Sequence, residues 1–183
     1  MQDIASPTDT PSPGADFGRW GAALLLATKA WAVTGAASFL GLVAMSLVSI
    51  VGRKLVSAPL PGDVEVLQMV AAGAAASFFG YCHLQGGDVK VDFFTQKAAP
   101  RTVLLMDAAG SLLVGLFGTL LAWRTAVGAL ALREVGETSA ILAWPVWVAQ
   151  GAVVPGLVLL GLAGFYMAAH CLRRRHAIAR GAA

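Results

Sequence analysis

The chain has 183 residues, of which 57% are hydrophobic and only 13% are charged, and its formal net charge is +3. The charged share is about half of the roughly 25% that is usual in soluble domains, so the composition excludes an ordinary soluble domain. A net charge this small gives no support for a nucleic-acid partner, and the length leaves room for one compact membrane domain and no second one.

Four long apolar runs dominate the sequence, and Asp107 is the only charged residue inside any of them. Each is close to the roughly 20 residues that a helix needs to cross about 30 Å of hydrocarbon. We therefore predict an all-α integral membrane protein with four transmembrane helices, inside a membrane domain of residues 19–172. The spans are expected at about residues 30–51, 64–84, 103–123 and 145–169.

The two chain ends are expected to lie outside the helical domain. Residues 1–18 contain three prolines and three aspartates but no basic residue, which predicts a disordered tail and no cleavable signal peptide. Residues 173–183 form a basic tail. The segment 19–29 is too short to cross a membrane, and we favour an amphipathic interfacial element there over an inward extension of the first span.

The connectors carry the helix-stopping residues. Pro59 and Pro61 exclude regular helix before the second span, and Asp63 is expected to be its N-cap, with Glu65 also at the positive helix end. Gly86 and Gly87 are expected to end the second helix. The segment 88–98 is then predicted to lie along the membrane surface.

The third span is expected to continue as helix to Arg133, and residues 136–140 are predicted to form an external turn. Trp144, Pro145 and Trp147 follow where an aromatic belt is expected. Pro155, well inside the fourth span, predicts a kink because proline removes a backbone hydrogen bond.

Small residues recur at four-residue spacing on the second and third spans, which lets helix backbones approach closely in lipid. They are Gly73 with Ser77, Ala76 with Gly80, and the series Ser111, Gly115 and Thr119.

Positive charge predicts the orientation. If all four runs span, nine of the thirteen Lys and Arg residues lie on the side that holds both termini, including Arg173, Arg174 and Arg175. The positive-inside rule then places the N-terminus and the C-terminus in the cytoplasm.

Few residues are candidates for chemistry. Asp107 is either functional, as an intramembrane carboxylate, or paired with Arg101 near the interface. His83 and His170 are both expected at the cytoplasmic ends of their spans. If the chain were the anchor of a haem or quinone complex, these two histidines would have to hold the haem. Gln150 with Pro155 would matter if the chain were a self-sufficient homo-oligomeric transporter. No nucleophile motif or phosphate loop is present, so no catalytic, cofactor or metal site is expected.

The order of the connector motifs resembles the small membrane subunit of tripartite ATP-independent periplasmic (TRAP) transporters. Arg53 follows the first span, the segments 59–65 (PLPGDVE) and 86–92 (GGDVKVD) flank the second, and Pro100-Arg101 precedes the third. The motifs around the fourth span are Gly136-Glu137, Ser139, Pro145, Trp147 and Pro155-Gly156.

The resemblance implies a partner of a large multi-spanning permease and a periplasmic substrate-binding protein in the bacterial inner membrane. The large subunit is then expected to carry the substrate and sodium sites, for organic anions such as C4-dicarboxylates or sialic acids. This chain would brace that subunit, and the small residues of its second and third spans would pack on it. The candidate interface or structural residues are Arg53, Asp63, Glu65, Gly86, Asp88, Asp92, Arg101, Asp107, Pro145 and Trp147.

Overall fold

A computed structural model describes residues 17–56, 61–87 and 100–179 of the chain. These residues form four helices, α1 (Arg19–Val56), α2 (Asp63–Leu84), α3 (Pro100–Val135) and α4 (Val146–Ala179). All four are long and apolar enough to cross a membrane. The prediction of an all-α protein with four membrane helices is confirmed.

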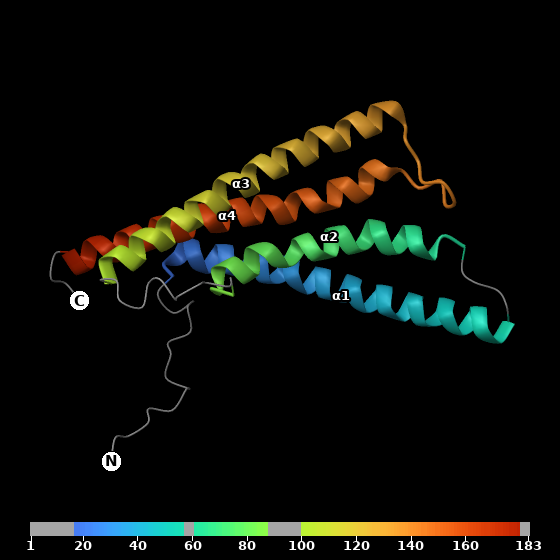
Figure 1. Ribbon diagram of the computed structural model, residues 1–183, viewed down its shortest axis with the longest axis horizontal. Helices are drawn as coiled ribbons and strands as arrows, with labels where there is room; N and C mark the ends of the chain where they lie inside the picture. Colours follow the sequence, from blue (N-terminus) through green and yellow to red (C-terminus); the bar gives the residue numbers. More distant parts are fainter. Residues whose placement is uncertain (1–16, 57–60, 88–99, 180–183) are drawn as a thin grey trace, which may run out of the picture.

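The helices lie side by side in one layer, in the order α1, α2, α4, α3 (Figure 1). α4 packs on α2 along one side and on α3 along the other, whereas α1 packs on α2 and touches α4 only slightly. No described residues of α3 pack on α1 or α2. A layer one helix thick has two broad faces, and most large apolar side chains lie exposed on them.

Small residues bring α4 into backbone contact with α2. A Cβ atom on Gly156 would lie 2.5 Å from the Ala76 carbonyl oxygen, and one on Gly80 would lie 3.1 Å from the Leu159 carbonyl carbon. Ala76 meets Gly156 and the later Gly80 meets the later Leu159, so α2 and α4 run parallel. Gly156 follows Pro155, and α4 is continuous across that proline, so the kink stays a prediction.

The contact of α4 with α3 is equally close and antiparallel. A Cβ atom on Gly164 would lie 2.4 Å from the Gly115 backbone nitrogen and 2.8 Å from the Ser111 carbonyl oxygen. One on Gly161 would lie 2.7 Å from the Thr119 hydroxyl. The small-residue faces of the second and third spans therefore meet α4 of the same chain. Much of this surface is therefore used within the chain, but Gly73 and Ser77 also line an open groove, so packing of these faces on another subunit stays a prediction.

The helix ends follow the glycines. In α2 the Gly87 N–H donates to the Cys82 carbonyl and the Gly86 N–H to the His83 carbonyl, with Gly86 at φ 66°. This is a Schellman motif, in which a left-handed residue closes the last turn. Gly136 ends α3 in the same way at φ 70°. The predicted ends at Gly86 and after Arg133 are confirmed.

Two expectations at the chain ends need correction. The segment 19–29 is the first part of the single helix α1 and not a separate element, because no proline interrupts the helix between residues 19 and 56. Phe17 also contacts α4 and is not part of a free tail. Residues 1–16 and the predicted surface segment at 88–98 lie outside the described residues, and α4 runs through the basic cluster to Ala179.

Replacing Gly164 by Ala should destabilise the α3–α4 contact, because the added methyl group would meet backbone atoms of α3 that cannot rotate away. Overpacking of this kind costs about 1–3 kcal/mol. We expect a lower melting temperature for the purified chain in mild detergent. Gly110→Ala on α3 is the control, since its Cβ would meet nothing within 4 Å. Equal melting temperatures for Gly164→Ala and the unmodified chain would show that the contact is looser than described.

Candidate functional site

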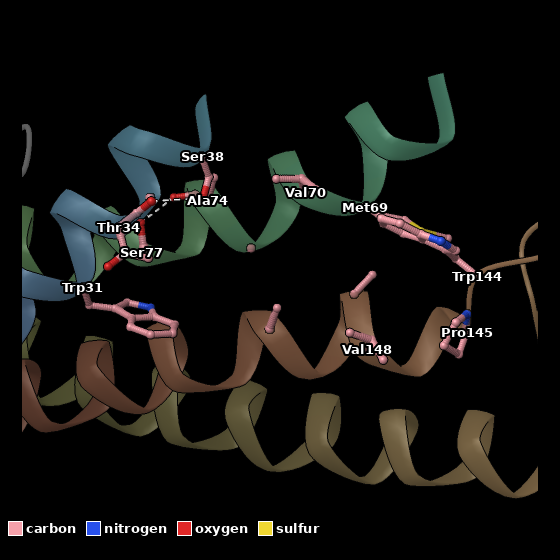
Figure 2. Close-up of a pocket in the computed structure, with 14 residues that line it drawn as sticks. Trp31, Thr34, Ser38, Met69, Val70, Ala74, Ser77, Trp144, Pro145 and Val148 are labelled. Atoms are coloured by element: carbon pink, nitrogen blue, oxygen red, sulfur yellow. Dashed lines mark hydrogen bonds between the residues drawn. The ribbon is translucent and has the colours of Figure 1, made fainter. Parts of the chain in front are cut away.

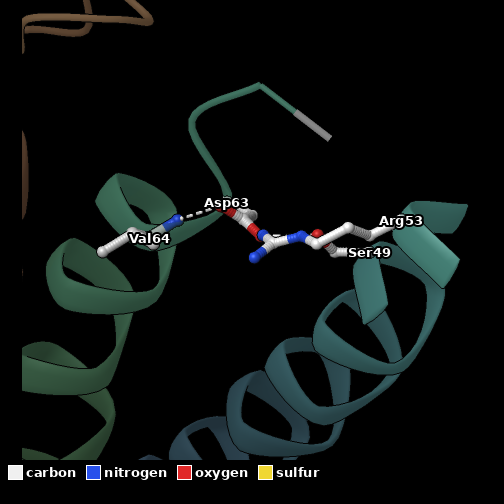
Figure 3. A network of polar contacts seen from close by, with 4 residues as sticks. All are labelled: Ser49, Arg53, Asp63 and Val64. Carbon is white, nitrogen blue, oxygen red and sulfur yellow. Dashed lines mark hydrogen bonds and ion pairs between the residues drawn. The ribbon is translucent and has the colours of Figure 1, made fainter. Parts of the chain in front are cut away.

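A carboxylate at the start of α2 ties that helix to the end of α1 (Figure 3). The Ser49 hydroxyl, 1% exposed on α1, donates to Asp63 Oδ2 at 2.5 Å. Arg53 Nη2 lies 3.5 Å from the same oxygen, and the Val64 N–H donates to Asp63 Oδ1 at 2.8 Å. Hydrogen bonds to a charged acceptor are stronger than neutral ones, whereas an exposed ion pair contributes little. The bond from Ser49 is therefore the main polar link between the two helices.

The prediction that Asp63 is the N-cap of α2 is wrong. Gly62 occupies the cap position at φ 78°, and Asp63 is the first helical residue. The turn after Pro61 needs a left-handed residue, which glycine adopts at little cost. Asp63 and Glu65 both lie in the first turn of α2, where a negative charge is stabilised by the helix dipole, as predicted.

Glu65 connects α2 to the loop between α3 and α4. Its Oε1 accepts the Ile141 N–H at 2.8 Å, and its Oε2 accepts the Leu142 N–H at 3.0 Å. Leu142 also covers Gly62, whose Cβ, if present, would lie 2.5 Å from Leu142 Cγ. One end of the layer is thus a continuous network, the connector platform, formed by Ser49, Arg53, Gly62, Asp63, Glu65, Ile141 and Leu142.

The loop itself is held in a tight shape. Thr138 and Pro145 form a β-bridge, and the Ser139 N–H donates to the Trp144 carbonyl at 2.8 Å. The Arg133 guanidinium lies 5.3 Å from the centre of the Trp147 ring, a cation–π contact between α3 and α4. Pro145 and Trp147 therefore have structural roles in this loop, in addition to the predicted place at a membrane interface.

Next to the platform, an apolar groove of about 460 Å³ opens between α1 and α4, with α2 as its floor (Figure 2). Trp31 lies near one end and Trp144 near the other. The groove contains many small side chains, so its floor is close to the helix backbones. Its lining residues are Trp31, Thr34, Gly35, Ser38, Met69, Val70, Gly73, Ala74, Ser77, Trp144, Pro145, Val148, Ala149 and Ala152.

The structure does not bring the remaining candidates to this site. Asp107 is half-buried near the start of α3, beside the buried Ala108. Gly86 is the left-handed residue at the end of α2. Asp88 and Asp92 lie outside the described residues, and Arg101 is in the first turn of α3 with its side chain outside the description.

The histidines occupy different packing environments. His83 is buried on α2, whereas His170 on α4 lies against the rings of Phe17 and Tyr166. Among the described residues, no group of three His, Cys, Asp or Glu side chains could hold a metal ion. The arrangement around His170 is an aromatic contact between α4 and Phe17, which lies just before α1.

A protein-family model matches residues 42–179, and its description is "Tripartite ATP-independent periplasmic transporters, DctQ component". The chain belongs to this family. It is therefore a small permease subunit of a TRAP transporter, a multi-pass membrane protein and not an enzyme. No curated protein and no solved structure is significantly similar to the chain.

Sequence reasoning identified Arg53, Asp63 and Glu65 but not the partners that define the platform. Ser49 is one of several serines in α1, and nothing in the sequence around it indicates a contact with Asp63. Glu65 and Ile141 are 76 positions apart, and the first-turn position of Glu65 was already a sufficient local explanation for an acidic residue. The groove also has no sequence signal of its own, since it exists only where three helices diverge.

Replacing Glu65 by Gln should loosen the α3–α4 loop. The amide can offer an acceptor to only one of the two N–H groups, and it removes the negative charge. We expect hydrogen exchange at Ile141 and Leu142 to become several-fold faster. Glu137→Gln is a charge-matched control in the same loop, because the described contacts of Glu137 are made by its backbone. If both variants accelerated exchange equally, the effect would come from loop charge and not from the Glu65 hydrogen bonds.

Proposed function

We propose that this subunit braces a large multi-spanning permease for sodium-coupled uptake of an organic anion that a periplasmic binding protein delivers. Family membership supports the transporter role. The complex is placed in the bacterial inner membrane. The substrate and sodium sites are assigned to the large subunit, in keeping with the resemblance of the connector motifs to TRAP small subunits.

The groove is the observation that supports the proposed bracing role. Helix packing in lipid relies on close van der Waals contact, which small residues allow. Gly35, Gly73, Ala149 and Ala152 line the groove from three helices, and Trp31 and Trp144 lie near its ends. Such a surface accepts another helix more closely than it accepts a disordered acyl chain. The proposed occupant is a membrane helix of the large permease subunit.

The charge distribution indicates how the subunit is oriented in the membrane. Both termini are placed in the cytoplasm because nine of the thirteen Lys and Arg residues lie on that side. The connector platform then faces the periplasm, where Arg53 and the loop held by Glu65 would meet the binding protein. Asp88 and Asp92 would lie on the cytoplasmic side, close in sequence to Lys90 and Arg101.

A bulky residue in the groove should prevent docking of the large subunit. Val148 lines the groove and is 49% exposed, so Val148→Trp would fill part of the space. Val158 on the same helix is 43% exposed but does not line the groove, which makes Val158→Trp a matched control. We expect Val148→Trp to reduce co-purification of the large subunit from native membranes several-fold, with Val158→Trp close to normal. Normal recovery with Val148→Trp would show that the large subunit binds elsewhere.

Uptake by the reconstituted complex tests the transport proposal. With the binding protein present, we expect uptake of a C4-dicarboxylate or sialic acid only when a sodium gradient is imposed. Vesicles that hold the small subunit alone should take up none of them. Uptake that follows a proton gradient would contradict sodium coupling, and uptake by the small subunit alone would favour the self-sufficient alternative.

A further inference from the structure

A second cavity, lined by both apolar and polar groups, lies at the other end of the layer, between the start of α1 and the last third of α4. Its volume is about 360 Å³. The lining side chains come from both helices and include two arginines, a histidine, a tyrosine and a tryptophan. The lining residues are Gly18, Trp20, Gly21, Tyr166, His170, Arg173 and Arg174.

Aromatic contacts hold the two helices in place around this cavity. The Phe17 ring lies edge-on to Tyr166 and to His170, with centroid distances of 5.4 Å in both pairs. Tyr166 and His170 stack at 6.2 Å. Gly21 lets the Tyr166 hydroxyl lie directly on the α1 backbone, since a Cβ there would be 2.2 Å from the hydroxyl oxygen. The cavity is therefore built by packed residues of α1 and α4 and by the two residues that precede α1.

The charge of the cavity is positive. Arg173 and Arg174 contribute two guanidinium groups, and no lining residue is acidic. Guanidinium groups match the oxygens of phosphate in a two-pronged geometry. The first turn of α1 adds to the positive potential of the cavity, because the positive end of the helix lies at Gly18 and the turn carries no acidic residue.

Its position on the helices selects a membrane lipid over a free anion. The cavity lies where the apolar parts of α1 and α4 give way to the arginine cluster. Trp20 at its rim is 87% exposed, as expected for an indole that lies at the headgroup level of a bilayer. Basic pockets between membrane helices bind anionic headgroups. We propose that this cavity binds the phosphate of an anionic phospholipid, whose acyl chains lie along the apolar parts of α1 and α4.

Gly18 allows a sharp test. Its carbonyl accepts the Ala22 N–H, so it is the N-cap of α1, and a Cβ at this position would meet nothing within 4 Å. Asp and Asn cap a helix about equally well. Gly18→Asp therefore puts a negative charge in the cavity, whereas Gly18→Asn gives the same cap without the charge.

The measurement is native mass spectrometry of the full chain in detergent with added phosphatidylglycerol or phosphatidylcholine. We expect selective retention of phosphatidylglycerol and a loss of affinity of about tenfold or more in Gly18→Asp, as a like charge would cause. Gly18→Asn should bind normally. The double variant Arg173→Gln/Arg174→Gln should also lose binding, and Arg124→Gln/Arg175→Gln, with the same change in charge at residues that do not line the cavity, should keep it.

Three results would overturn the proposal. Equal retention of the two lipids by the unmodified chain would show that no anionic headgroup is recognised. Equal loss in the two arginine double variants, or in both Gly18 variants, would show that the cavity itself does not bind the lipid. Displacement of phosphatidylglycerol by an excess of inorganic phosphate would identify the ligand as a free anion, whereas retention under that excess supports the lipid.

Discussion

Close contact between helix backbones along α4 is the constraint on which the rest of the layer depends. Lipid tails are as apolar as leucine side chains, so helices in a membrane gain little from burying apolar surface against each other. What remains is van der Waals contact, which improves as backbones approach. Gly156 meets α2, and Gly161 and Gly164 meet α3. These positions lie on different sides of α4, and they make it the central helix of the layer.

The position of α1 follows from weaker and more local contacts. Near its start it touches α4 through Gly21, beside the contact of the preceding Phe17 with the same helix, and near its end it is tied to α2 through Ser49. Between them, Gly35 brings it close to Ser77 of α2. Because α1 lies on α2 and is separate from α4 over this stretch, a groove forms above α2. The groove is thus a direct result of which helix each glycine faces.

Local patterns were sufficient to predict the four helices and the ends of α2 and α3, but not the start of α1 or the cap of α2. The apolar runs gave the four spans, and Gly86 and Gly136 marked the ends of α2 and α3 because each provides the left-handed residue that closes a helix. The small-residue faces were also recognised, but not their partner. A four-residue spacing shows that a close contact exists and cannot show which helix makes it. The connector platform could not be predicted for the same reason, since Glu65 and Leu142 are adjacent only after folding.

The continuity of α1 has a consequence for the surrounding bilayer. At about 1.5 Å per residue its 38 residues extend about 57 Å, which exceeds the roughly 40–45 Å of a whole bilayer with its headgroups. α3, with 36 residues, is almost as long. A helix of this length must tilt, project into water or thicken the membrane around it, each at a modest cost. Bilayer thickness therefore becomes a variable that sets the inclination of this subunit, and any protein attached to it would be inclined with it.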